Sequence, residues 1–202
     1  MAMMKTTGTY ESCHARTVMS LSWGATPGIV IIGPASTLAQ AAEAAAAGAQ
    51  LIDVGRANEL IQVVRAQISD VGVCADDAGP DGSEADVVRD AAWAAHGGAR
   101  LICTDTDAAA AAVQVGVAPG RIAVRTDPAG IEAVRKAGWT ALADLQPWAD
   151  SAVRTQAVAA VCVWLGAGVI RTPHVAAVRR SIDMTESILG HRPPVRAIRG
   201  LA

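Results

Sequence analysis

The chain has 202 residues, of which 51% are hydrophobic, and its formal net charge is −2 with an isoelectric point of about 6.1. This length corresponds to one domain, and the charge balance excludes the basic excess expected of a protein that binds nucleic acid or an anionic membrane. No apolar stretch has the length of a membrane span and the N-terminal segment 1–16 lacks the apolar core of a secretory signal, so the sequence predicts a cytoplasmic protein.

Short apolar runs alternate with helical patterns along the chain. The first strand is predicted at 29–32, and the Ala-rich helix after it begins at Ser36 or Thr37 and is closed by Gly48. The run 18–21 is a candidate for an additional strand. The same pattern continues with strands at 51–54, 71–74, 101–103, 121–124, 140–142 and 168–170, and with helices at 58–68, 84–96, 107–115, 130–137, 149–165 and 174–189.

The strands are short and wholly apolar, which is typical of parallel strands covered by helices. The repeated units therefore predict an α/β fold, a TIM-barrel-like (β/α) repeat with about seven to eight parallel strands and right-handed crossovers. A doubly wound open sheet is the structural alternative. We expect a barrel domain over 17–191, a disordered segment at 1–16 and an extended tail at 192–202.

Polar side chains follow the predicted strands, at the end of a parallel barrel where active sites lie. Carboxylates there would accept hydrogen bonds from a nitrogen-rich heterocycle, and Arg171 would hold an anion or stack on a flat ring. The predicted rim comprises Asp53, Asp76, Asp77, Thr104, Asp105, Thr126, Asp127, Asp144, Arg171, Thr172 and His174.

A structural role is the alternative for each of these acidic residues, since a carboxylate after a strand often caps the next helix. Asp105 and Asp107 are the best examples. Asp53 differs because it lies inside its strand, where a carboxylate needs a partner. Common nucleotide-binding, zinc-protease and serine-hydrolase motifs are absent from the sequence. No two cysteines are spaced as CxxC, which predicts no metal site, and Cys74 and Cys103 are expected to be buried free thiols.

Four segments, in the same order along the chain, resemble the dihydropteroate synthase family. GAGVIRTPHVAAVRRSIDMTESILGHRPP (Gly166–Pro194) resembles the family's final strand and helix, and most specifically the actinobacterial second paralogue. AAAAGAQLIDVG (Ala44–Gly55) resembles the IDVG stretch. HGGARLICTD (His96–Asp105) and VAPGRIAVRTDP (Val117–Pro128) resemble two further strand ends of the family.

The resemblance implies a TIM barrel that condenses a pterin pyrophosphate with p-aminobenzoate in folate biosynthesis. It implies pterin contacts from Asp53, Asp76, Asp127 and Arg171, with His174 near phosphate. It also implies Mg²⁺ if the chain is an active transferase. A homodimer is implied as well, formed by the C-terminal helical segments Ala157–Leu165 and Val175–Ile188.

This chain departs from the family pattern at several working positions, and it is shortened. Cys103 stands where the family has an Asn, Ala143-Asp144-Leu145 replaces Ser-Arg-Lys, and Pro173 aligns with the family's His. The loop that shapes the aminobenzoate site is reduced to Gly55-Arg56-Ala57-Asn58. These departures predict pterin binding with weak or lost synthase activity. A non-catalytic dimeric scaffold and a different small-molecule enzyme on a barrel are the alternatives.

Overall fold

The computed structural model describes residues 28–55, 58–68, 71–76, 101–114 and 116–192. Its strands are β1 (Val30–Pro34), β2 (Leu51–Asp53), β3 (Gly72–Asp76), β4 (Leu101–Thr104), β5 (Ile122–Thr126), β6 (Thr140–Asp144) and β7 (Val169–Arg171). Its helices are α1 (Leu38–Ala46), α2 (Asn58–Gln67), α4 (Thr106–Gln114), α5 (Ile131–Lys136), α6 (Ala152–Leu165) and α7 (Val175–Ile188), with short 3-10 helices η1 (Pro119–Arg121), η2 (Pro128–Gly130) and η3 (Gln146–Trp148). Within these ranges no helix is both long and apolar enough to cross a membrane.

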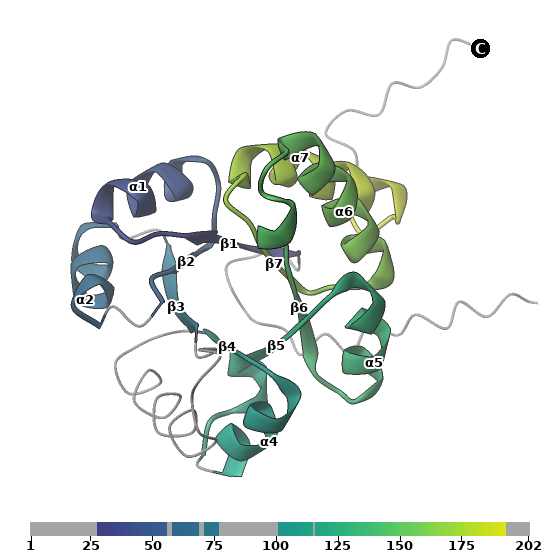
Figure 1. The fold of residues 1–202 in the computed structure, drawn as a ribbon, viewed down its shortest axis with the longest axis horizontal. Helices are drawn as coiled ribbons and strands as arrows, with labels where there is room; N and C mark the ends of the chain where they lie inside the picture. Colours follow the sequence, from purple (N-terminus) through teal and green to yellow (C-terminus); the bar gives the residue numbers. More distant parts are fainter. Residues whose placement is uncertain (1–27, 56–57, 69–70, 77–100, 115, 193–202) are drawn as a thin grey trace, which may run out of the picture.

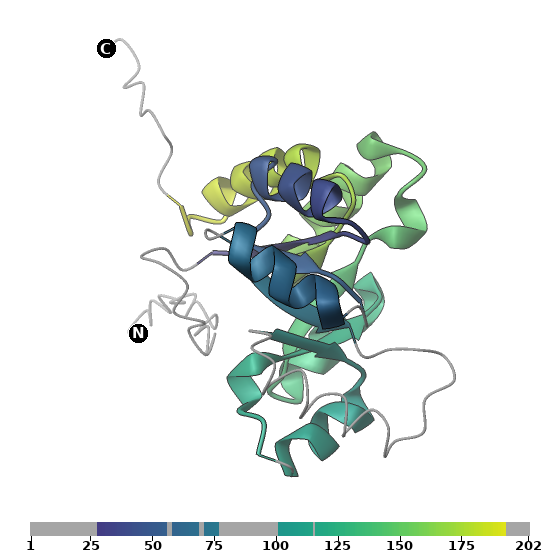
Figure 2. The ribbon, with the colours of Figure 1, turned by 90° about the vertical axis from the view of Figure 1, so that its left-hand side faces the viewer.

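The seven described strands form a closed parallel barrel in chain order. β1 pairs with β7 through Val30 opposite Val169 and Ile31 opposite Ile170, and this pairing closes the ring. The predicted α/β barrel is therefore confirmed, and the open doubly wound sheet is wrong. The helices surround the strands (Figure 1), and α1 and α2 lie side by side on one flank (Figure 2). The predicted strand at 18–21, the helix at 84–96 and the segments 1–16 and 193–202 lie outside the described residues.

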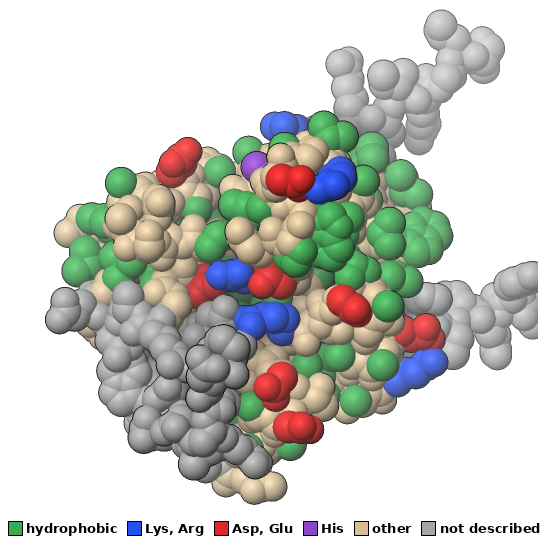
Figure 3. All heavy atoms as spheres, viewed as in Figure 1, with side chains coloured by type: hydrophobic (Ala, Val, Ile, Leu, Met, Phe, Trp, Pro, Cys, Tyr) green, Lys and Arg blue, Asp and Glu red, His purple; other side chains and the backbone are tan. Residues whose placement is uncertain are grey.

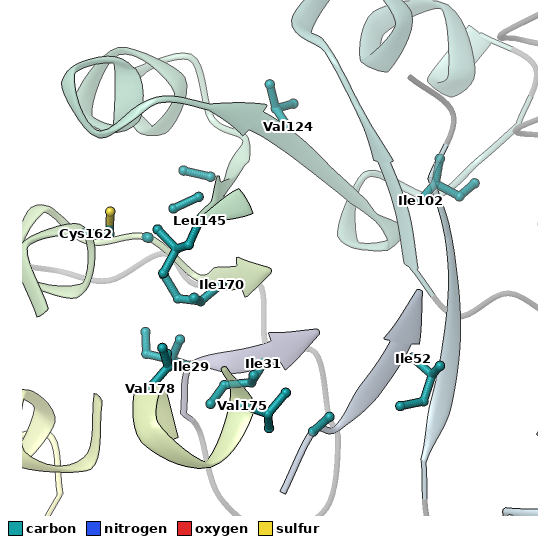
Figure 4. Close-up of a cluster of buried hydrophobic side chains, with 14 of the residues drawn as sticks. Ile29, Ile31, Ile52, Ile102, Val124, Leu145, Cys162, Ile170, Val175 and Val178 are labelled. Carbon is teal, nitrogen blue, oxygen red and sulfur yellow. The ribbon is translucent and has the colours of Figure 1, made fainter. Parts of the chain in front are cut away.

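Alternate residues of each strand belong to two separate apolar cores, because successive side chains of a strand point to opposite faces. The outer core lies between the strands and the helices, where Ile31 and Ile170 pack near Val175 and Val178 of α7 (Figure 4). The inner core fills the barrel, and each of the seven strands contributes at least one residue to it. Its members are Val30, Ile32, Leu51, Cys74, Leu101, Cys103, Ala123, Leu142 and Val169.

The first helix shows how local sequence sets the fold. Thr37, rather than Ser36, caps α1, because its hydroxyl accepts a hydrogen bond from the Gln40 N–H at 3.3 Å. Gly48 ends the helix with φ of 98°, a conformation that favours glycine. In β1, a Cβ on Gly33 would lie only 2.6 Å from the Cβ of Ala44, so this glycine lets α1 approach the strand closely.

The cysteines of the described part are free and buried, as predicted for Cys74 and Cys103. Both lie in the inner core, and the Cys74 thiol is 3.6 Å from the carbonyl oxygen of Ile52. Cys162 packs in the outer core, where burial raises the pKa of its thiol to about 11. The thiols therefore act as small apolar side chains.

Candidate functional site

Arg171, the last residue of β7, joins two other strand ends at the carboxyl rim of the barrel. Its Nε donates a hydrogen bond to Oδ2 of Asp53, at the end of β2, over 2.6 Å. Its NH1 donates to Oδ2 of Asp144, at the end of β6, over 3.0 Å. Asp144 lies opposite Arg171 in the β6–β7 register, whereas Asp53 is two strands away across β1. One guanidinium thus bridges residues that are 118 and 27 positions away in sequence.

Backbone groups hold both carboxylates in place. Oδ1 of Asp53 accepts a hydrogen bond from the Gly55 N–H at 2.8 Å, and Oδ1 of Asp144 accepts one from the Gln146 N–H at 3.0 Å. Each carboxylate therefore binds the backbone with one oxygen and Arg171 with the other. Asp53 is the last residue of β2, which ends one residue earlier than predicted, and it is 3% exposed. The prediction that this buried carboxylate has a partner is confirmed by its ion pair with Arg171.

Arg125 is the rim residue that the sequence analysis missed. It lies on β5, and its Nε is 3.8 Å from Oδ2 of Asp144. The residues predicted for this part of the rim are Thr126, which ends β5, and Asp127, which follows it. The missed signal is the two-residue period, because Ala123 faces the inner core and Arg125 therefore faces the same way. Acidic and basic side chains gather near the middle of this face of the molecule (Figure 3).

Four charged side chains thus cover the inner core at the carboxyl end. They follow inner-core residues by two positions in β2, β5, β6 and β7, and their formal charges cancel. We call them the rim quartet: Asp53, Arg125, Asp144 and Arg171. Their placement follows from strand alternation together with closure of the barrel.

Two other predicted rim residues cap helices. Oδ1 of Asp127 accepts a hydrogen bond from the Gly130 N–H at 2.8 Å and caps η2. Oδ1 of Asp105 accepts one from the Ala108 N–H at 2.9 Å at the start of α4. Asp127 is exposed and stands outside the rim quartet. Asp76 ends β3 opposite Cys103, and its side chain lies outside the described part of the chain.

His174 precedes α7 and is bound to the loop before α6. Its Nε2 is 2.8 Å from the carbonyl oxygen of Ala149, and since a carbonyl only accepts, Nε2 carries the proton. Its backbone N–H donates to Oγ1 of Thr172 at 3.1 Å. The residue also lines an open cavity of about 450 Å³ between α1 and α7, together with Glu43 and Arg180.

The described residues do not fit a magnesium site. Among them, no group of three or more His, Cys, Asp or Glu side chains is placed to hold a metal ion. The two rim carboxylates, Asp53 and Asp144, each have an oxygen bonded to Arg171.

No protein-family model matches this sequence, and no curated protein is similar enough to count as a relative. Solved structures do share the fold. Rv1207 of Mycobacterium tuberculosis is 22% identical, with a TM-score of 0.63 over 84% of this chain and 94% of that chain. Dihydropteroate synthase from Yersinia pestis is 16% identical, with a TM-score of 0.60 over 81% and 93%. The synthase from Xanthomonas albilineans, solved in complex with 7,8-dihydropteroate, is 14% identical, with a TM-score of 0.60 over 80% and 93%.

At these identities the comparison shows the fold: a parallel barrel of the dihydropteroate synthase type, here with seven described strands in a shortened chain. The resemblance found in the sequence is confirmed as a structural similarity.

Proposed function

We propose that this chain, which has the barrel fold of the dihydropteroate synthases, is a cytoplasmic pterin-binding protein related to folate biosynthesis, with weak or lost synthase activity. The observation that carries the proposal is the network in which Arg171 joins Asp53 and Asp144 at the carboxyl rim. A guanidinium offers a flat cationic face to a heterocycle, and carboxylates accept hydrogen bonds from its ring and amino N–H groups. Asp76 and Asp127 are the further ligand contacts that the resemblance implies.

We expect weak or lost synthase activity because of the side chains at the positions where this chain differs from the family pattern. Cys103 and Leu145 are buried and apolar, and neither supplies the polar group implied for its segment of the family pattern. Pro173 has no side-chain donor with which to bind phosphate. Because a charge-stabilising donor is worth orders of magnitude in rate, a chain lacking several of them is expected to turn over slowly. If the chain is active, it is a transferase of the dihydropteroate synthase type.

Calorimetry with 6-hydroxymethylpterin and with pteroate tests the binding proposal. We expect saturable binding, weakened at least tenfold by Asp127→Ala, because a hydrogen bond to a charged group contributes about 1.5 to 3 kcal/mol. Asp105→Ala is the matched control, since Asp105 also caps the turn after a rim strand but is not a proposed contact. Absence of heat and of a thermal shift at millimolar ligand would refute pterin binding.

A turnover assay tests the second half of the proposal. With the pterin pyrophosphate, p-aminobenzoate and magnesium, we expect dihydropteroate formation far below that of an ordinary synthase. A rate close to that of an ordinary synthase would show that the family residues missing from this chain are not needed for catalysis.

Exposed apolar side chains on α6 and α7 favour a second proposal, that the chain forms a homodimer. Such a dimer is also what the alternative function, a non-catalytic scaffold, requires. Val153, Val161 and Trp164 on α6 are 76%, 53% and 63% exposed, and Met184 and Ile188 on α7 are 60% and 68% exposed. Hydrophobic side chains also gather on the flank of the molecule that α6 occupies (Figure 3). Several large apolar side chains exposed on neighbouring helices are typical of an interface.

Sedimentation velocity tests the dimer. We expect the wild-type chain to sediment as a dimer and Trp164→Glu to sediment as a monomer, since a charge in an apolar interface lacks a partner. Val63→Glu is the control, because Val63 is a partly exposed apolar residue on α2, away from these helices. A wild-type monomer at high micromolar concentration would rule the dimer out.

A further inference from the structure

We infer that Asp144 determines the ligand specificity of the rim, by making it accept an uncharged heterocycle and reject one that carries a phosphate or pyrophosphate group. The inference rests on the proposed pterin-binding function and specifies which chemical form of the ligand binds. Asp144 is a positioning residue, because it acts on the ligand through Arg171.

The charge of Arg171 is already matched by two carboxylates. Its Nε binds Asp53 at 2.6 Å and its NH1 binds Asp144 at 3.0 Å. Both carboxylates are also fixed by backbone N–H groups, those of Gly55 and Gln146, so neither swings away without losing a second hydrogen bond. A phosphate that approached Arg171 would meet two negative charges close to the one positive charge.

Arg125, the other cation of the rim quartet, faces the same carboxylate. The Nε of Arg125 lies 3.8 Å from the same Asp144 oxygen that binds Arg171. The Nε2–H of the His174 ring donates to the carbonyl oxygen of Ala149 and is therefore not free to bind an anion. The rim quartet, with two carboxylates and two guanidinium groups, thus offers an anion no excess positive charge, whereas phosphate recognition relies on charge-assisted hydrogen bonds.

Asp144 is the member of the rim quartet that contacts both arginines. Its side chain is 19% exposed, against 2% for Asp53, so it lies closer to where a ligand would enter. Like charges placed together at a binding site oppose association, and they do so more strongly where water is partly excluded. Neutralising Asp144 leaves the rim quartet with a net positive charge. The same change keeps the hydrogen bond from the Gln146 N–H, because the asparagine oxygen still accepts it, and it removes the acceptor for Arg171 NH1.

Three probes test the inference by calorimetry: inorganic pyrophosphate, 6-hydroxymethylpterin and its diphosphate ester. The wild-type chain is expected to bind the uncharged pterin at least tenfold more tightly than the ester. Asp144→Asn is expected to raise the affinity for inorganic pyrophosphate at least tenfold and to change the affinity for the uncharged pterin much less. Asp150→Asn is the control, because Asp150 is an exposed acidic residue paired with Arg154 and is expected to change none of the three affinities.

The outcomes separate this inference from the proposed function. Wild-type binding of pyrophosphate as tight as that of Asp144→Asn overturns the specificity role, and so does wild-type binding of the ester as tight as that of the alcohol. Failure of every pterin to bind, together with a pyrophosphate gain in Asp144→Asn, refutes the proposed function while supporting the charge argument. If Asp144→Asn does not fold, Asp144→Ser and the wild-type comparison of alcohol with ester decide the same point.

Discussion

Replacing Asp53 with alanine is expected to lower the free energy of unfolding by about 3 to 5 kcal/mol, the range found when one partner of a buried ion pair is removed. Asp53 is 3% exposed and Arg171 is partly buried, and their bond is the shorter of the two that Arg171 makes to the rim carboxylates. The substitution leaves two guanidinium groups and one carboxylate in the rim quartet, which is a net positive charge near the inner core. It also removes the acceptor for the Gly55 N–H.

Urea denaturation of the wild-type chain and the variant measures this loss. Asp150→Ala is the matched control, because its pair with Arg154 is exposed and its removal is expected to change the free energy by about 1 kcal/mol or less. The double variant Asp53→Leu, Arg171→Met is expected to regain most of the stability, since buried ion pairs are replaced by apolar residues at little net cost. A loss in Asp53→Ala no larger than in the control would show that the pair does not stabilise the barrel.

Replacing Leu142 with alanine is expected to destabilise the chain by about 2 to 5 kcal/mol, because a buried leucine loses both its transfer free energy and its packing contacts. Leu142 is fully buried in the inner core. It lies opposite Arg125 in the β5–β6 register and two residues before Asp144, so it forms part of the floor below the rim quartet. The barrel interior is enclosed by its strands, which limits how far neighbouring groups can move to fill the space.

Thermal and urea unfolding of Leu142→Ala provide the measurement. Val153→Ala is the control, because Val153 is 76% exposed on α6 and its truncation is expected to change stability by about 0.5 kcal/mol or less. Equal stability of the two variants would mean that the inner core is not close-packed.

Much of the fold was predictable because its signals are local. Buried strands such as 29–32 and 168–170 are short apolar runs between turn residues, and the helix boundary at Thr37 and Gly48 follows from capping chemistry. Closure of the barrel was harder to predict from the sequence, because the pairing of β1 with β7 joins residues near opposite ends of the described chain. No local pattern distinguishes a closed barrel from an open sheet, because both bury their strands on two faces.

The candidate site was also predictable only in part. The apolar runs alone place Asp53 and Arg171 at or near the ends of strands, and the cost of burying a charge predicts that Asp53 has a partner. The folded barrel is needed to see that the partner is Arg171, that Asp144 binds the same guanidinium, and that Arg125 completes the rim quartet. The physical reason is that strand alternation directs each side chain inward, whereas the distance between two inward side chains depends on which strands the closed ring makes neighbours.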